Sequence, residues 1–165
     1  MNNININSIK KLKTPYEIKN EFNINYEDTL FINNCRSTIN NILCGKSKKK
    51  LIIVGPCSIH NYEECLSYAK LLKNKMNEFP NLYIVIRLYF EKPRTINGWK
   101  GFLYDPDLNS SNKIDEGLIK TRKLLIEITK MRIPIATEFL DTIIPQYIDD
   151  LISFGCIGAR TVESQ

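Results

Sequence analysis

The chain has 165 residues, of which 43% are hydrophobic and 25% charged, values that fit one ordinary globular domain. Its formal net charge is +5, yet the lysines are scattered along the chain and no aromatic stacking motif accompanies them. The composition therefore argues against a nucleic-acid-binding protein.

The cysteines and the N-terminus bear on the cellular compartment. The five cysteines show no CxxC spacing, so they predict neither a disulfide framework nor a zinc knuckle. The N-terminus lacks the apolar core of a signal peptide, and no apolar run reaches the length of a membrane span. We expect a cytoplasmic protein with reduced thiols and no membrane contact.

The first segment, residues 1–27, is polar, rich in asparagine and weakly patterned. We expect it to form an arm that lies on another subunit and does not join the core. Residues 28–43 carry a helical stripe of apolar side chains that Gly45 closes. The basic turn at 46–50, KSKKK, is expected to be solvated. The apolar stripe of residues 28–43 consists of Ile32, Cys35, Ile39, Ile42 and Leu43.

Two wholly apolar strands come next. The first covers residues 51–55, and a helix follows it from Asn61, where Glu64 completes a pattern like a capping box. The second strand covers residues 82–90, and both strands have the composition of buried parallel strands. The irregular stretch 91–113 after it is longer than compact domains usually tolerate without a function.

The second half of the chain repeats this alternation. A helix is predicted over residues 114–131 and a strand over 135–139. A short helix follows over 145–152, opened by Pro145, and a last strand covers 156–160. Helices that alternate with buried strands predict a parallel α/β fold.

Three cations gather around the second strand. Arg87 lies inside it, and Lys92 and Arg94 come just past its C-terminal end. A guanidinium inside an apolar strand needs an anionic partner. Two interpretations remain open: a site for a doubly anionic small molecule, such as a phosphorylated acid, or one buried ion pair beside a solvated charged loop.

Functional groups lie at the ends of all four predicted strands: Cys57, Lys92 with Arg94, Glu138 and Arg160. The chain has no GxGxxG or GxxxxGK[ST] loop, which argues against a Rossmann or P-loop protein. Such groups at the C-terminal ends of successive strands are typical of (β/α)₈ barrels, which usually need about 250 residues. The expected fold class is therefore α/β, the first half of a TIM barrel after an N-terminal arm and helix, truncated after the fourth strand.

Several long motifs stand in a recognisable order and spacing. They are GPCSIH (55–60), RLYFEKPRT (87–95), GWKG (98–101), EFLD (138–141), PQY (145–147) and GARTVESQ (158–165). Together they resemble type I 3-deoxy-D-arabino-heptulosonate 7-phosphate (DAHP) synthase, the first enzyme of the shikimate pathway to chorismate and the aromatic amino acids. The resemblance runs from about residue 28 to the end and corresponds to the N-terminal half of the family's chain.

The resemblance implies a reaction and a substrate site. The family is a transferase that condenses phosphoenolpyruvate with D-erythrose 4-phosphate and water, giving DAHP and phosphate. Arg87, Lys92 and Arg160 match positions that hold phosphoenolpyruvate, and Lys92 is the candidate for proton transfer. Glu138 matches an acidic residue near the phosphate of phosphoenolpyruvate. Arg94 and Thr95 match the segment that receives the phosphate of erythrose 4-phosphate.

The resemblance also implies a divalent metal ion of the manganese, iron, cobalt or zinc type. Cys57 matches its sulfur ligand, and the other ligands are expected beyond residue 165, so we expect the isolated chain to be inactive. His60, the only histidine, could pair with Cys57, but two such ligands are too few for a transition-metal site. Two structural alternatives stay open: Cys57 as a small buried apolar residue, and Glu138 as an ion-pair partner.

The sequence also leads to expectations about partners, and it leaves several functions open. The resemblance implies a homo-oligomer and feedback inhibition by an aromatic amino acid. The chain could be an incomplete piece of the enzyme, a truncated non-catalytic chain that serves as a partner or regulatory subunit, or a basic binding module, which the motifs argue against. The related eight-carbon ulosonate phosphate synthase shares the chemistry, but KPRT with GWKG favours the seven-carbon enzyme.

Overall fold

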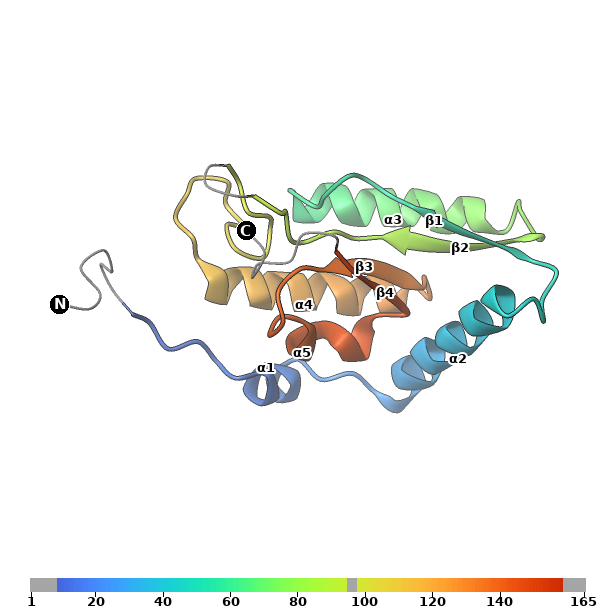
Figure 1. Cartoon of the computed structure of the whole chain (residues 1–165), viewed down its shortest axis with the longest axis horizontal. Helices are drawn as coiled ribbons and strands as arrows, with labels where there is room; N and C mark the ends of the chain where they lie inside the picture. The colour runs from blue at the N-terminus through green and yellow to red at the C-terminus, as the bar shows by residue number, and fades with distance from the viewer. Residues whose placement is uncertain (1–8, 95–97, 159–165) are drawn as a thin grey trace.

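The computed structural model describes residues 9–94 and 98–158. A parallel sheet in the order β1-β2-β3-β4 forms its centre, and helices alternate with the strands as the sequence predicts (Figure 1). None of the helices in these residues is long and apolar enough to cross a membrane. The strands are β1 (Lys50–Val54), β2 (Leu82–Arg87), β3 (Ile135–Phe139) and β4 (Phe154–Ile157). The helices are α1 (Pro15–Glu21), α2 (Tyr26–Leu43), α3 (Tyr62–Met76), α4 (Ile114–Lys130), α5 (Pro145–Ile148) and the 3₁₀ turn η1 (Asp149–Leu151).

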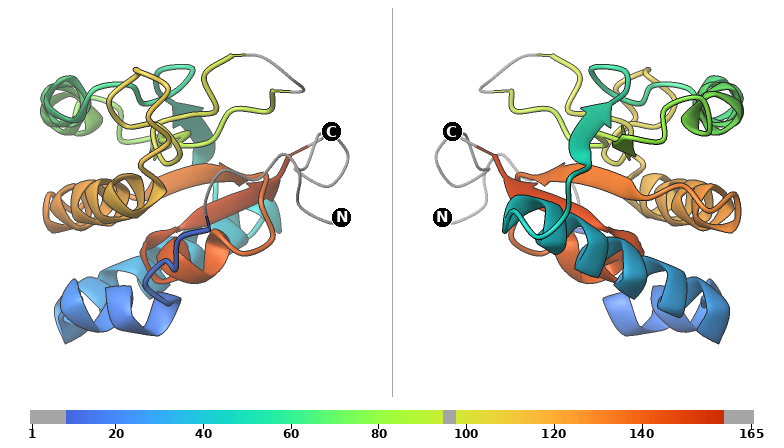
Figure 2. Two further views of the ribbon diagram at one scale, coloured as in Figure 1. Left: turned by 90° about the vertical axis from the view of Figure 1, so that its left-hand side faces the viewer. Right: turned by 90° about the vertical axis from the view of Figure 1, so that its right-hand side faces the viewer.

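The two faces of β2 belong to different cores. Ile86 is part of the main core, which lies between the sheet and the helices α3 and α4 (Figure 2). Val85 packs instead with Ile39 of α2 and Ala136 of β3. Because side chains alternate along a strand, Arg87 lies on the same side of β2 as Val85.

Asparagine side chains fix where two helices begin. Asn25 Oδ1 accepts a hydrogen bond from the amide of Asp28 at 2.7 Å, so α2 begins at Tyr26, two residues before the predicted start. Asn61 Oδ1 accepts from the amide of Glu64 at 3.0 Å, which confirms the predicted start of α3. Each such cap stabilises its helix by about 1 kcal/mol.

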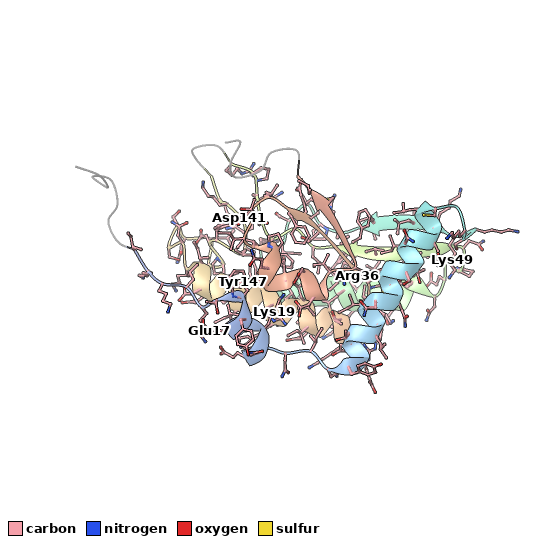
Figure 3. The ribbon with its side chains drawn as sticks, turned by 60° about the horizontal axis from the view of Figure 1, so that its bottom comes forward. Glu17, Lys19, Arg36, Lys49, Asp141 and Tyr147 are labelled. Carbon is pink, nitrogen blue, oxygen red and sulfur yellow. The ribbon has the colours of Figure 1, made fainter. Side chains whose placement is uncertain are left out.

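Helix α1 is part of the core of its own chain. Ile18 is buried in the main core, and the buried guanidinium of Arg122 donates to Phe22 O at 2.8 Å. Tyr147 of α5 donates to a backbone carbonyl just before α1 at 2.8 Å (Figure 3). The expectation that residues 1–27 stay outside the core is therefore wrong for α1, because its apolar face packs on α4 and α5. A contact of this segment with another subunit stays a prediction.

The edge strands are more exposed than the sequence predicts. Ile52 and Ile53 of β1 are each 39% exposed, and Ile157 of β4 is 84% exposed. In the described chain each of these strands has a partner on one side only. The inner strand β2 has the predicted burial, with Val85 and Ile86 fully covered, because strands and helices flank it.

The long stretch between β2 and α4 folds back on the end of β2. The amide of Leu103 donates to Phe90 O at 3.1 Å, and the amide of Lys92 donates to Lys100 O at 2.9 Å. Gly101 has a φ of 110°, and a Cβ there would lie 2.2 Å from Phe90 O. Glycine is thus required for the loop to approach the strand end this closely.

Candidate active site

Arg87 lies at the end of β2, beside the loop that follows β1. Its guanidinium donates to Gly55 O at 3.1 Å and to Pro56 O at 3.1 and 3.3 Å. Among the arginines that the structure describes, Arg122 and Arg132 pair with carboxylates, whereas Arg87 does not. Within the described residues no carboxylate forms an ion pair with Arg87, so the structure shows no buried ion pair for it there. Carbonyl dipoles hold the guanidinium, and its charge can serve an anion.

Lys92 and Cys57 meet between the first two strand ends. Lys92 Nζ donates to Cys57 Sγ at 3.0 Å and to Cys57 O at 3.3 Å. The pKa of the exposed Cys57 thiol is lowered, mainly by this hydrogen bond and the charge of Lys92, with smaller contributions from Arg87 and Arg94. The four side chains thus form one electropositive region that favours a thiolate. The alternative of Cys57 as a buried apolar residue is wrong, because the residue is exposed.

Glu138 lies on the next strand, opposite Cys156 of β4 in the sheet register. Its Oε1 lies close to Gly158, where a Cβ would stand 2.8 Å from it and 2.2 Å from Leu140 Cδ2. Burial raises the pKa of Tyr89, and Cys156 and the negative charge of Glu138 add smaller contributions; the Tyr89 hydroxyl lies 3.9 Å from Cys156 Sγ. Sequence reasoning missed Tyr89 and Cys156. Alternation along the strand could have found Tyr89, since it lies two residues past Arg87.

Two predicted substrate residues, Thr95 and Arg160, lie outside the described residues. Of the predicted site residues that the structure describes, Cys57, Arg87 and Lys92 lie together. Arg94 is exposed and close enough to act on the thiol of Cys57.

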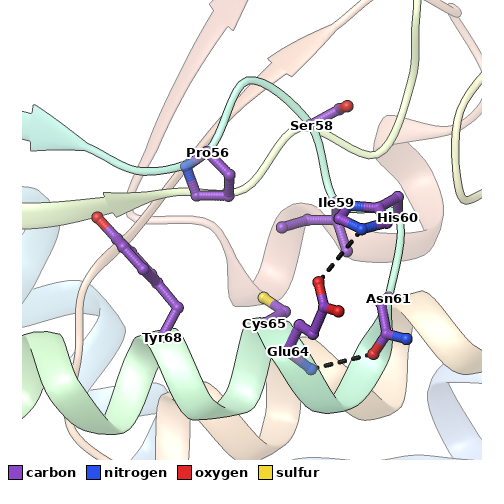
Figure 4. A pocket seen from close by; sticks show the side chains of 8 residues that line it. All are labelled: Pro56, Ser58, Ile59, His60, Asn61, Glu64, Cys65 and Tyr68. Carbon is purple, nitrogen blue, oxygen red and sulfur yellow. Dashed lines mark hydrogen bonds and ion pairs between the residues drawn. The ribbon is translucent and has the colours of Figure 1, made fainter.

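His60 does not join Cys57. Its Nε2 pairs with Glu64 Oε2 at 3.2 Å, at the first turn of α3 (Figure 4). The cavity around it, of about 210 Å³, lies between this turn and the loop after β1, apart from the Lys92 contact. Its lining consists of Pro56, Ser58, Ile59, His60, Asn61, Glu64, Cys65 and Tyr68.

The described residues supply one suitable metal ligand. The thiol of Cys57 is exposed and its pKa is lowered, which favours the thiolate, the form that binds soft metal ions. Within residues 9–94 and 98–158, no three histidine, cysteine, aspartate or glutamate side chains converge on one point. A catalytic zinc-type site usually needs three protein ligands. These residues therefore fit one corner of a metal site and do not complete it.

Sequence reasoning also missed an acidic cluster next to Lys92. Glu91 is 5% exposed, and its carboxyl accepts hydrogen bonds from the Tyr104 hydroxyl at 3.2 Å and from the amide of Leu140 at 3.3 Å. The same hydroxyl lies 3.4 Å from Asp141 Oδ2. A glutamate directly after a buried strand is the signal that could have revealed this cluster.

The fold and the site together define a class of protein. Four parallel strands, the first three each followed by a helix, that collect cations and a thiol at their C-terminal ends have the arrangement of a (β/α)₈-barrel enzyme, present here over its first half. The chain belongs to the DAHP synthetase I family, whose sequence model matches residues 13–165.

Individual relatives agree with this assignment. The Trp-sensitive phospho-2-dehydro-3-deoxyheptonate aldolase of Escherichia coli K12 is 46% identical over 158 residues, covering 95% of this chain and 45% of that protein. The Tyr-sensitive aldolase of the same strain is 43% identical over 166 residues, covering 100% and 47%. The solved aldolase of Francisella tularensis SCHU S4 superposes with a TM-score of 0.90 at 43% identity, covering 98% and 48%. The chain thus spans about half the length of the relatives it matches.

Proposed function

We propose that the protein containing this chain is a DAHP synthase. It condenses phosphoenolpyruvate with D-erythrose 4-phosphate and water to give DAHP and inorganic phosphate, the first step of the shikimate pathway. Membership of the family and the names of the relatives support the proposal.

One observation carries the proposal within this chain. Arg87 and Lys92 both lie at the C-terminal end of β2, beside the loop that follows β1, and neither forms an ion pair with a carboxylate of the described residues. Phosphoenolpyruvate carries a phosphate and a carboxylate on one small molecule, and clustered cations suit both groups. Arg160 completes this cradle in the proposal.

The other site residues take the following roles. Glu138 acts near the phosphate of phosphoenolpyruvate, through water or by orienting a cation, and Arg94 with Thr95 receives the phosphate of erythrose 4-phosphate. In the reaction, C3 of phosphoenolpyruvate bonds to the aldehyde carbon, whose oxygen takes up a proton. Water then adds at C2 and inorganic phosphate leaves. Arg87 and Lys92 hold the anion in line, and the ammonium of Lys92 is the proposed proton source.

The family is generally metal-dependent. We propose Cys57 as the sulfur ligand of a divalent ion of the manganese, iron, cobalt or zinc type. A bound metal would act as a Lewis acid toward the aldehyde oxygen.

Regulation and assembly are further parts of the proposal. Relatives named Trp-sensitive and Tyr-sensitive support feedback control by an aromatic amino acid. We also propose a homo-oligomer with residues 1–27 at a subunit contact. A cytoplasmic location suits the five free thiols.

Phosphate release tests this function directly. The full gene product, supplied in turn with each divalent metal, should release phosphate from phosphoenolpyruvate only when erythrose 4-phosphate is present. Release without the aldehyde, or no release with any of the metals, would contradict the proposal.

A further inference from the structure

Glu91, Tyr104 and Asp141 form a polar cluster that the proposed chemistry does not use, in which Glu91 is buried and the other two residues are half-buried. Glu91 Oε1 accepts from the Tyr104 hydroxyl at 3.2 Å, and Glu91 Oε2 accepts from the amide of Leu140 at 3.3 Å. The Tyr104 hydroxyl also lies 3.4 Å from Asp141 Oδ2. One hydroxyl proton therefore stands between two carboxyl groups, although it can serve only one of them at a time.

The cluster favours one additional proton. Burial, helped by the negative charge of Asp141, raises the pKa of Glu91 to about 7 despite the lowering effect of the hydrogen bonds from Leu140 and Tyr104. Tyr104 and Asp141 are the titratable groups that face Glu91 from the packed segments. The neighbouring Lys92 directs its ammonium at Cys57. Two unprotonated carboxylates here would repel each other in a poorly hydrated place.

The cluster connects two segments of the candidate active site. Glu91 precedes Lys92, whose amide is bonded to Lys100 O at 2.9 Å. Asp141 follows the end of β3, where its Oδ1 accepts from the amides of Ile143 at 2.6 Å and Ile144 at 3.1 Å. The Tyr104 bridge thus joins the strand end that carries Lys92 to the strand end that carries Glu138.

We propose that Glu91 is a positioning residue whose protonated carboxyl fastens the Lys92 segment to the end of β3 and so keeps Lys92 in place for phosphoenolpyruvate. This inference rests on the proposed function. Loss of the proton creates repulsion between Glu91 and Asp141, which loosens the segment and adds a negative charge beside an anion site.

The inference predicts how the affinity for phosphoenolpyruvate depends on pH. If the fastened form binds, the apparent affinity falls with the protonated fraction of Glu91, by about tenfold between pH 6 and pH 8. Glu91→Gln carries no charge at any pH. Its affinity should therefore change over this range only by the titration of phosphoenolpyruvate itself, which is common to all variants.

A matched control is available on the outer surface. Glu127 accepts from the Tyr62 hydroxyl at 2.7 Å, so it is also a glutamate bonded to a tyrosine, but it is exposed and lies on α4 away from the strand ends. We would titrate the metal-loaded full gene product with phosphoenolpyruvate by calorimetry from pH 6 to pH 8.5, as wild type, E91Q and E127Q. The E127Q profile should follow the wild type, and the E91Q profile should be flatter by about tenfold. Parallel profiles of wild type and E91Q would overturn the inference.

A second measurement keeps the inference testable if phosphoenolpyruvate does not bind or if E91Q does not fold. Amide hydrogen exchange of wild type, corrected for the intrinsic effect of pH, should lose protection at Lys92 and Leu103 between pH 6 and pH 8, with Ile86 as the internal reference. Unchanged protection at Lys92 would overturn the inference. Absence of phosphoenolpyruvate binding at every pH would instead contradict the proposed function, so the two failures are distinguishable.

Discussion

Lys92 Nζ lies 3.0 Å from Cys57 Sγ, although the two residues belong to different strand ends. The parallel pairing of β1 with β2 brings the two following loops together, and the thiolate and the ammonium stabilise each other there. A residue proposed to bind substrate is thus in direct contact with a residue proposed to bind metal.

The first prediction follows from this contact. In metal-free protein, Lys92→Met should raise the pKa of the Cys57 thiol toward its ordinary value, because the main cause of its lowering is removed. Alkylation rates against pH, read by mass spectrometry of the separate peptides, measure the change. The exposed Cys44 serves as an internal reference that should not move. An unchanged Cys57 profile would show that Lys92 does not control the thiol.

The second prediction concerns the metal. Cys57→Ser in the full gene product should lower metal affinity and activity without unfolding the protein, because Cys57 is exposed and fills no core position. Calorimetric metal titration measures the loss, and Cys44→Ser is the matched control for removing an exposed thiol. Equal metal affinity in both variants would exclude Cys57 as a ligand.

The sequence predicted the fold better than the site. Apolar strands and helical stripes are local patterns, so the four parallel strands and the helices between them could be predicted, although β2 ends at Arg87 and not at residue 90. The core position of α1 could not be predicted, because it depends on a hydrogen bond from Arg122 to the carbonyl of Phe22, and the two residues are 100 positions apart in the sequence. The Glu91–Tyr104 pair was missed for the same reason, since only the fold brings the two residues together.

The third prediction concerns Arg160, which lies outside the described residues. Arg160→Ala in the full gene product should weaken phosphoenolpyruvate binding far more than erythrose 4-phosphate binding, because we propose Arg160 as a ligand of the phosphoenolpyruvate phosphate. Steady-state kinetics with each substrate varied in turn measures the two losses. Equal losses for both substrates would remove this assignment.

The fourth prediction concerns stability. Arg122 is buried, and its two terminal nitrogens each donate to one carboxylate oxygen of Asp150 at 2.8 Å. Asp150→Ala leaves this charge without its carboxylate and should reduce the free energy of unfolding by about 3–5 kcal/mol. Urea unfolding measures the change. Glu78→Ala, which removes the exposed pair with Lys75, should cost less than about 1 kcal/mol, and equal losses would show that burial of Arg122 is unimportant.

The central claim is that Arg87 binds an anionic substrate, and calorimetric titration of the full gene product with phosphoenolpyruvate tests it most directly. Arg36 is the control, since it also donates only to backbone carbonyls, those of Asp149 and Ile152, but from α2 (Figure 3). Arg87→Ala should weaken binding by about 10- to 100-fold, the loss of a charge-assisted hydrogen bond of about 1.5–3 kcal/mol. Arg36→Ala should bind like the wild type. Unchanged affinity in Arg87→Ala would contradict the account.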